Sequence, residues 1–143
     1  MILSHHNLFL FVDELGPSKI AVPAARLNAI VVVDNVAAGP VIGGTRLPLE
    51  VSVEECVRLA RTMTLKNAVA GLRHGGAKSV VVDDPKMPAA ETEHTIRAIA
   101  IAIRQITDYI PGPDMGTEEA AMAWVHDEIS RAVGLPEEGR LSC

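Results

Sequence analysis

Residues 72–85 read Leu72-Arg73-His74-Gly75-Gly76-Ala77-Lys78-Ser79-Val80-Val81-Val82-Asp83-Asp84-Pro85 and contain the clearest strand signal in the sequence. The valine run at 80–82 predicts a short buried strand that ends at the Asp-Asp-Pro turn. Gly75 and Gly76 favour either a turn with positive φ or a backbone that lies close to a ligand. Lys78 would then lie at the mouth of the strand, where burial and a second cation would lower the pKa of its amine. Such a lysine can act as a base or nucleophile, although a surface lysine at a tight turn is the alternative.

Two further segments place charged residues at the ends of predicted elements. Lys66 ends a helical pattern at residues 63–67, and Asp114 lies in a glycine- and proline-rich turn before another helix. Two lysines and an aspartate at such positions form a plausible site, so we expect Lys66, Lys78 and Asp114 to converge on one cleft. Taken alone, Lys66 would be an ordinary lysine favoured by the helix dipole.

These segments resemble the N-terminal, substrate-binding and dimerisation domain of the glutamate/leucine/phenylalanine/valine dehydrogenases. The resemblance extends from about Leu8 to Gly134 and depends on four ordered motifs. They are Gly39-Pro40-Val41-Ile42-Gly43-Gly44-Thr45-Arg46, Met63-Thr64-Leu65-Lys66-Asn67, the segment from Gly75 to Pro85, and Pro113-Asp114-Met115-Gly116-Thr117 followed by Met122-Ala123-Trp124.

The resemblance implies an enzyme that deaminates an L-amino acid oxidatively to a 2-oxo acid and passes hydride to NAD or NADP. Lys78 would be the catalytic lysine that activates the attacking water, and Asp114 would move protons to and from the amine. Lys66 would hold the substrate α-carboxylate. Gly43 and Gly44 would line the substrate pocket through backbone atoms.

The residue before Gly43 helps to set the substrate class in this family, and here it is Ile42. Members that act on acidic substrates carry a lysine at this position. An apolar side chain cannot offset the desolvation of a substrate carboxylate, so Ile42 predicts an apolar amino acid. The segment around Asp114 resembles the glutamate enzymes more closely, so the subfamily signals are mixed.

Composition predicts one domain over residues 1–143 and excludes several classes of protein. Hydrophobic residues make up 48% of the chain, which argues against disorder. The net charge of -5 comes without a basic patch, so we expect no nucleic-acid partner. No apolar run approaches the ~20 residues of a membrane span. Two cysteines give no disulfide framework, which fits a reducing cytoplasm.

Apolar patterning predicts an α/β fold with a mixed sheet flanked by helices, antiparallel in its first half and parallel in its second. We expect Leu8–Val12 and Ala29–Val33 to pair as antiparallel neighbours. Ser52 should cap one helix and Thr117 another that stops at Gly134. The remaining predicted elements are strands at Val41–Leu47, Val80–Val82 and Tyr109–Ile110 and a helix over Ala89–Thr107.

Other candidate sites are weaker. Residues 75–79 differ from a phosphate-binding loop because Ala77 precedes the lysine, and no strand is followed by G-x-G-x-x-G. None of the five histidines has the i,i+4 spacing of a helical metal site, so no metal is predicted. His74 lies next to Gly75 and is a candidate for contact with substrate.

Members of the family continue into a dinucleotide-binding domain. Residues 1–143 contain no glycine fingerprint of such a domain. We therefore expect no cofactor site in this chain alone. It would be a fragment or truncation, a chain that works with a separate cofactor-domain partner, or a non-catalytic dimerising or amino-acid-binding module. The wide apolar stripe over residues 89–107 predicts a homo-oligomer, a dimer or larger.

Overall fold

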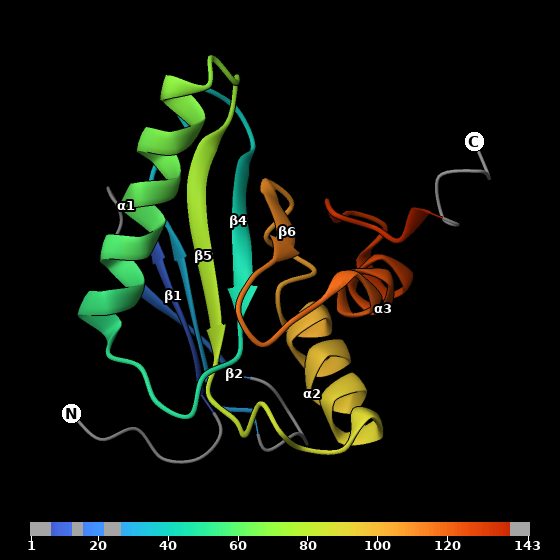
Figure 1. Ribbon diagram of the computed structural model, residues 1–143. Helices are drawn as coiled ribbons and strands as arrows, with labels where there is room; N and C mark the ends of the chain where they lie inside the picture. The colour runs from blue at the N-terminus through green and yellow to red at the C-terminus, as the bar shows by residue number, and fades with distance from the viewer. Residues whose placement is uncertain (1–6, 13–15, 22–26, 138–143) are drawn as a thin grey trace.

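A six-stranded mixed sheet separates helix α1 from helices α2 and α3 (Figure 1). The computed structural model describes residues 7–12, 16–21 and 27–137. The strand order is β2-β1-β3-β5-β4-β6. The elements are β1 (Asn7–Val12), β2 (Gly16–Ala21), β3 (Ala29–Val33), β4 (Val41–Arg46), α1 (Val53–Val69), β5 (Gly75–Val81), α2 (Ala89–Ala102), β6 (Tyr109–Pro113) and α3 (Glu119–Ile129).

Strand directions confirm the predicted fold class. β5, β4 and β6 run parallel to one another, whereas β3 is antiparallel to β5 and β2 is antiparallel to β1. The predicted antiparallel pairing of Leu8–Val12 with Ala29–Val33 is wrong, because β1 and β3 are parallel. The physical reason is β2, a strand at Gly16–Ala21 that the sequence analysis did not predict. It returns the chain along β1, so the next strand runs in the same direction as β1.

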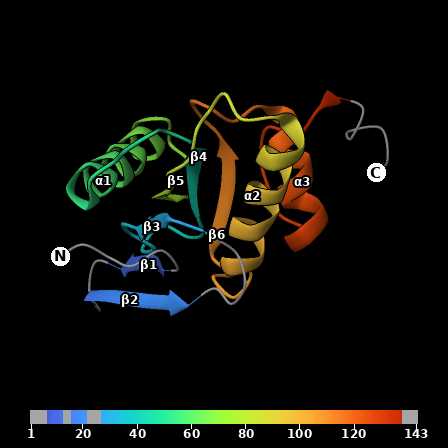
Figure 2. The same ribbon diagram turned by 90° about the horizontal axis from the view of Figure 1, so that it is seen from below.

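Two apolar layers hold the sheet between the helices (Figure 2). Alternation along β3 and β5 sends successive side chains to opposite faces. Val31, Val33 and Val81 join the larger layer under α2 and α3, whereas Ile30 and Val80 join the smaller layer under α1. Burial of each valine or isoleucine contributes about 1.5–3 kcal/mol, so these layers supply the main driving force for the fold.

Helix α1 begins as predicted and ends later than predicted. The Ser52 hydroxyl accepts a hydrogen bond from the Glu55 N–H at 3.1 Å, so Ser52 caps the helix as expected. Cys56 and Ala60 are fully buried against the sheet. The helix continues past Lys66 to Val69, so Lys66 lies within the last turn and not at the helix end.

Helices α2 and α3 pack against each other on the opposite face of the sheet. α2 ends at Ala102, short of the predicted Thr107. Its apolar stripe is wide because it meets both the sheet and α3, and Ile101 on its outer side is 49% exposed. The N-cap of α3 is Glu118, so the predicted cap at Thr117 is wrong. Ser130 in the left-handed conformation ends α3 before Gly134.

Candidate functional site

Lys78 lies in the middle of β5 and is almost fully buried. The predicted position at the strand mouth is wrong because β5 already begins at Gly75. Neither Gly75 nor Gly76 has a positive φ, so the first of the two alternatives for these glycines, a turn, is excluded. Gly76 is needed for close packing of helix on strand, since a Cβ there would lie 2.1 Å from the Thr64 backbone nitrogen of α1. The close approach is therefore to α1 and places that helix against the strand that carries Lys78.

The Lys78 amine forms an ion pair with Oδ2 of Asp114, which follows β6. β4 lies between β5 and β6 in the sheet, so the pair must cross it. It crosses at Gly44, where a Cβ would lie 2.8 Å from Oδ2 of Asp114. A side chain at residue 44 would occupy the space that the carboxylate takes, which gives a steric reason for glycine at this position.

The loop around Asp114 is fixed by its own backbone and by Thr117. The Met115 N–H donates to Oδ1 of Asp114 at 2.7 Å. The Thr117 hydroxyl accepts from the Asp114 N–H at 3.0 Å and donates to the Thr45 carbonyl of β4 at 2.6 Å. Thr117 thus ties the loop to the sheet and does not cap α3. This position was missed as a site residue because a Thr-Glu-Glu sequence is also typical of a helix start.

Burial, above all, lowers the pKa of Lys78 to about 8. The positive charge of Arg46 is the next cause, and Lys66 acts weakly in the same direction. The second cation beside Lys78 is therefore chiefly Arg46 and not Lys66, and the Arg46 guanidinium lies 3.4 Å from Oδ1 of Asp114. Sequence reasoning placed Arg46 in a motif without giving it a role, although its alternation with Gly44 along β4 put it on the same sheet face.

Ile42 and Gly43 lie next to this pair on β4. Alternation puts Ile42, which is half-buried, on the same face as Gly44. Gly43 is packed against β5, since a Cβ there would lie 1.7 Å from the Ala77 carbonyl oxygen. The Gly43 carbonyl accepts a hydrogen bond from the Tyr109 hydroxyl at 3.2 Å, so it is held from behind the sheet.

Lys66 and His74 are not partners in the ion pair of Lys78 with Asp114. Lys66 is exposed in the last turn of α1, and its side chain makes no hydrogen bond or ion pair within the described ranges. His74 is engaged at the start of β5, where its Nδ1 lies 2.8 Å from the Pro40 carbonyl oxygen. The structure thus brings Lys78 and Asp114 into contact and leaves the Lys66 ammonium available at the neighbouring helix.

A cavity of about 280 Å³ adjoins the loop that carries Asp114. Arg46 of β4 and Met115 and Gly116 of the loop form part of its lining. The Cys56 thiol lies beneath the site, and burial raises its pKa to about 12, so it stays protonated. Among the residues that the structure describes, no group of three or more His, Cys, Asp or Glu side chains could hold a metal ion. Over the same ranges, no helix has the length and hydropathy of a membrane span.

Comparison with known proteins agrees with the motifs. The family model of the Glu/Leu/Phe/Val dehydrogenase dimerisation domain matches residues 22–131. NADP(+)-dependent glutamate dehydrogenase of Pyrobaculum calidifontis is 42% identical over 104 residues, 70% of this chain and 25% of that protein. Leucine dehydrogenase of Bacillus subtilis is 38% identical over 114 residues, 76% of this chain and 31% of that protein.

A solved structure shows the same fold. The hetero-hexameric glutamate dehydrogenase of Thermus thermophilus superposes with a TM-score of 0.75 and 29% identity, over 92% of this chain and 33% of that one. The chain thus spans about a quarter to a third of the length of these relatives. It belongs to the Glu/Leu/Phe/Val dehydrogenase family and corresponds to the N-terminal domain of that family.

Proposed function

We propose that this chain forms the substrate-binding part of an amino-acid dehydrogenase, which converts an L-amino acid to its 2-oxo acid with NAD or NADP. The observation that carries the proposal is the ion pair of buried Lys78 with Asp114. It lies on the sheet face that carries α1, next to Arg46 and Met115, which form part of the lining of the cavity of about 280 Å³. A substrate could reach the pair from that side.

The roles follow from charge and protonation state. With its pKa lowered to about 8, Lys78 is partly neutral near neutral pH and can accept a proton from an attacking water. Asp114, in contact with the amine, can exchange a proton with the substrate amino group. The exposed ammonium of Lys66 is free to bind the α-carboxylate.

The proposed substrate has an apolar side chain. Ile42 lies on the same face as Gly44, and its aliphatic side chain offers no charge to a second carboxylate, whereas the charge of Arg46 on that face is engaged by Asp114. Leucine dehydrogenases are among the relatives, and the Thermus structure is of a leucine-bound form. Glutamate dehydrogenases are also among them, so the test below compares leucine with glutamate.

The residues of this chain do not fit a dinucleotide. No two of its 11 glycines have the G-x-G spacing that lets a backbone approach a pyrophosphate. We therefore assign the cofactor to none of these residues and propose that a second domain or a separate partner chain supplies that site. A module that binds an amino acid without turning it over is the alternative, favoured by the same lack of a glycine fingerprint.

The test is titration calorimetry of the purified chain with L-leucine and L-glutamate, with a parallel assay for reduction of NAD or NADP. We expect weak binding of leucine that is lost in Lys66→Met and kept in Lys86→Met, an exposed lysine that serves as the control. We expect no cofactor reduction, because hydride transfer requires a nicotinamide held at near-attack distance. Cofactor reduction by the wild-type chain that disappears in Lys78→Ala would contradict the proposal that the cofactor site lies outside these residues. Leucine binding that is unchanged in Lys66→Met would contradict the role of Lys66.

We also propose that the chain forms a homo-oligomer. The matched family model is that of a dimerisation domain, and the Thermus relative is hetero-hexameric. The apolar stripe of α2 gives less support than the sequence indicated, because α3 and the sheet cover most of it. Light scattering over a range of protein concentrations tests the proposal, and a monomer mass at the highest concentration would contradict it.

A further inference from the structure

Arg46 connects the two charged partners of the site. We propose that Arg46 is a positioning residue, which holds one carboxylate oxygen of Asp114 and thereby presents the other to the Lys78 amine. This inference rests on the proposed function, because it gives Arg46 a task within the same site. It is argued from hydrogen bonds, burial and charge in turn.

The two oxygens of Asp114 are held by different partners. Oδ1 accepts from Arg46 Nη2 at 3.4 Å and from the Met115 N–H at 2.7 Å, whereas Oδ2 pairs with Lys78. Rotation of the carboxylate would break the contacts of Oδ1. The orientation of Oδ2 toward Lys78 is therefore maintained by donors on the far side of the carboxylate.

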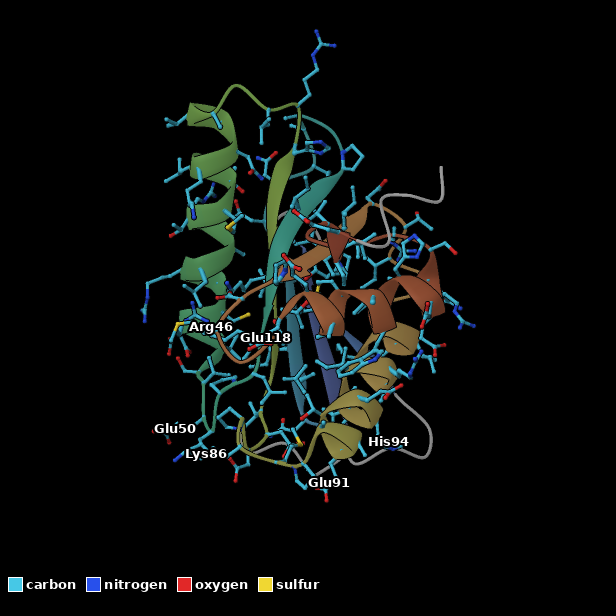
Figure 3. The ribbon with its side chains drawn as sticks, turned by 45° about the vertical axis from the view of Figure 1, so that its right-hand side comes forward. Arg46, Glu50, Lys86, Glu91, His94 and Glu118 are labelled. Atoms are coloured by element: carbon cyan, nitrogen blue, oxygen red, sulfur yellow. The ribbon has the colours of Figure 1, made fainter. Side chains whose placement is uncertain are left out.

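Arg46 is itself placed by the sheet and by the loop. It lies at the end of β4 and pairs with Val80 of β5, and the next residue, Leu47, donates its N–H to the Met115 carbonyl at 3.0 Å. Figure 3 labels Arg46 in this region, where β4 ends close to the loop before α3. The backbone next to Arg46 is thus hydrogen-bonded to the loop that carries Asp114, the acceptor of the guanidinium.

The ion pair of Arg46 with Asp114 is partly shielded from water. The Arg46 and Asp114 side chains are 22% and 14% exposed. Within the described ranges, the buried Nε of Arg46 has no hydrogen-bond partner. A buried donor without a partner costs free energy, and an Arg46 side chain that pointed into water would avoid this cost. The inward orientation therefore needs another explanation. The contact of Arg46 with the Asp114 carboxylate, which pairs with Lys78, provides that explanation.

The charge of Arg46 has a second consequence. A guanidinium stays protonated at any pH at which proteins are studied, so Arg46 remains positive while Lys78 titrates. It repels the protonated amine and, after burial, is the main cause that lowers the pKa of Lys78. A lysine at position 46 would keep the charge and lose the planar donor geometry.

The experiment follows the Lys78 side chain by NMR in the complete chain labelled with ¹³Cε-lysine, with the signal assigned by comparison with Lys78→Met. In Arg46→Met and Arg46→Gln we expect the pKa of Lys78 to rise on the order of one unit. In Arg46→Lys the positive charge is kept and the planar donor is lost, so the pKa of Lys78 should fall below the wild-type value, because a carboxylate that is no longer held stabilises the charged amine less. Arg58→Met, which removes an exposed arginine from α1, is the matched control and should leave the titration unchanged.

A folded Arg46→Lys protein in which Lys78 keeps its wild-type pKa would overturn the positioning role, and an unchanged titration in both folded neutral variants, Arg46→Met and Arg46→Gln, would overturn the charge effect. The two neutral replacements differ in shape and polarity, so a folding defect in one leaves the other as the test. Failure of the proposed function has a different signature. The wild type would then bind no amino acid, while the Lys78 titration would still respond to Arg46.

Discussion

The Tyr109 hydroxyl lies 2.7 Å from the Ser79 hydroxyl in the interior of the sheet, on the side opposite to Lys78. The Ser79 hydroxyl also lies 3.0 Å from the Thr45 hydroxyl, and the Tyr109 hydroxyl lies 3.2 Å from the Gly43 carbonyl oxygen. These buried hydroxyls join β4, β5 and β6, the strands that carry or precede the site. Because a buried polar group without a partner is costly, the chain of hydroxyls favours one relative placement of the three strands.

The first prediction concerns the titration of Tyr109. It is the single tyrosine of the chain, and burial raises its pKa from 10.0 to about 12. We expect phenolate absorbance to appear only near pH 12 in the folded protein and near pH 10 in urea. Since the folded state holds the proton more tightly, the contribution of Tyr109 to the free energy of unfolding is full below about pH 10 and falls as the pH rises through 12. A folded-state transition near 10 would contradict the buried hydroxyl chain.

The second prediction concerns Gly44 and Asp114. In Gly44→Ala the new methyl group would meet the Asp114 side chain, and we expect a loss of about 1–3 kcal/mol in the free energy of unfolding from overpacking. The clash involves Oδ2, Cγ and Cβ of Asp114, so the same substitution should cost less in an Asp114→Gly background, which removes all three atoms. Urea denaturation of the four proteins gives the coupling energy. Equal costs in the two backgrounds would show that Asp114 does not lie over Gly44.

The third prediction concerns the packing of α1 on β5. In Gly76→Ala the added Cβ would lie 2.1 Å from the Thr64 nitrogen and 2.5 Å from the Ala60 carbonyl oxygen. These are backbone atoms, so α1 must move as a unit, and we expect destabilisation toward the upper end of the ~1–3 kcal/mol range for overpacking. Val69→Ala is the control, because Val69 is 91% exposed and its truncation should change stability little. A stability of Gly76→Ala equal to that of the control would argue against the close contact.

The fourth prediction concerns the pH dependence of stability. The pKa of Lys78 falls from 10.5 to about 8 on folding, so between these values the unfolded chain binds more protons than the folded one. The free energy of unfolding of the wild type should therefore rise with pH from about 8 to about 10.5 relative to Lys78→Met. Chemical denaturation of both proteins across this range measures the difference. Identical slopes would mean that the Asp114 carboxylate offsets the effect of burial and of Arg46.

Local patterns were sufficient for several elements and for the residues of the site. The continuous apolar run at Ala29–Val33 predicted a strand, and β3 has the same bounds and is buried throughout. Ser52 with Glu55 predicted the start of α1. The motifs that carry Lys78 and Asp114 also led to the family, because four segments in order are far more specific than any one of them.

The contacts between distant segments were decided only by the tertiary structure. Gly75 and Gly76 suit a turn as well as a tightly packed strand, and only the approach of α1 at Thr64 distinguishes the two. The direction of β1 relative to β3 depends on β2, which has a Gly-Pro start and little apolar alternation. Arg46 became part of the site because the sheet order places β4 between β5 and β6, so that its guanidinium meets a carboxylate 68 residues away in the chain. Sequence periodicity records which face a residue occupies within its own element, whereas the neighbour across that face depends on how the elements pack together.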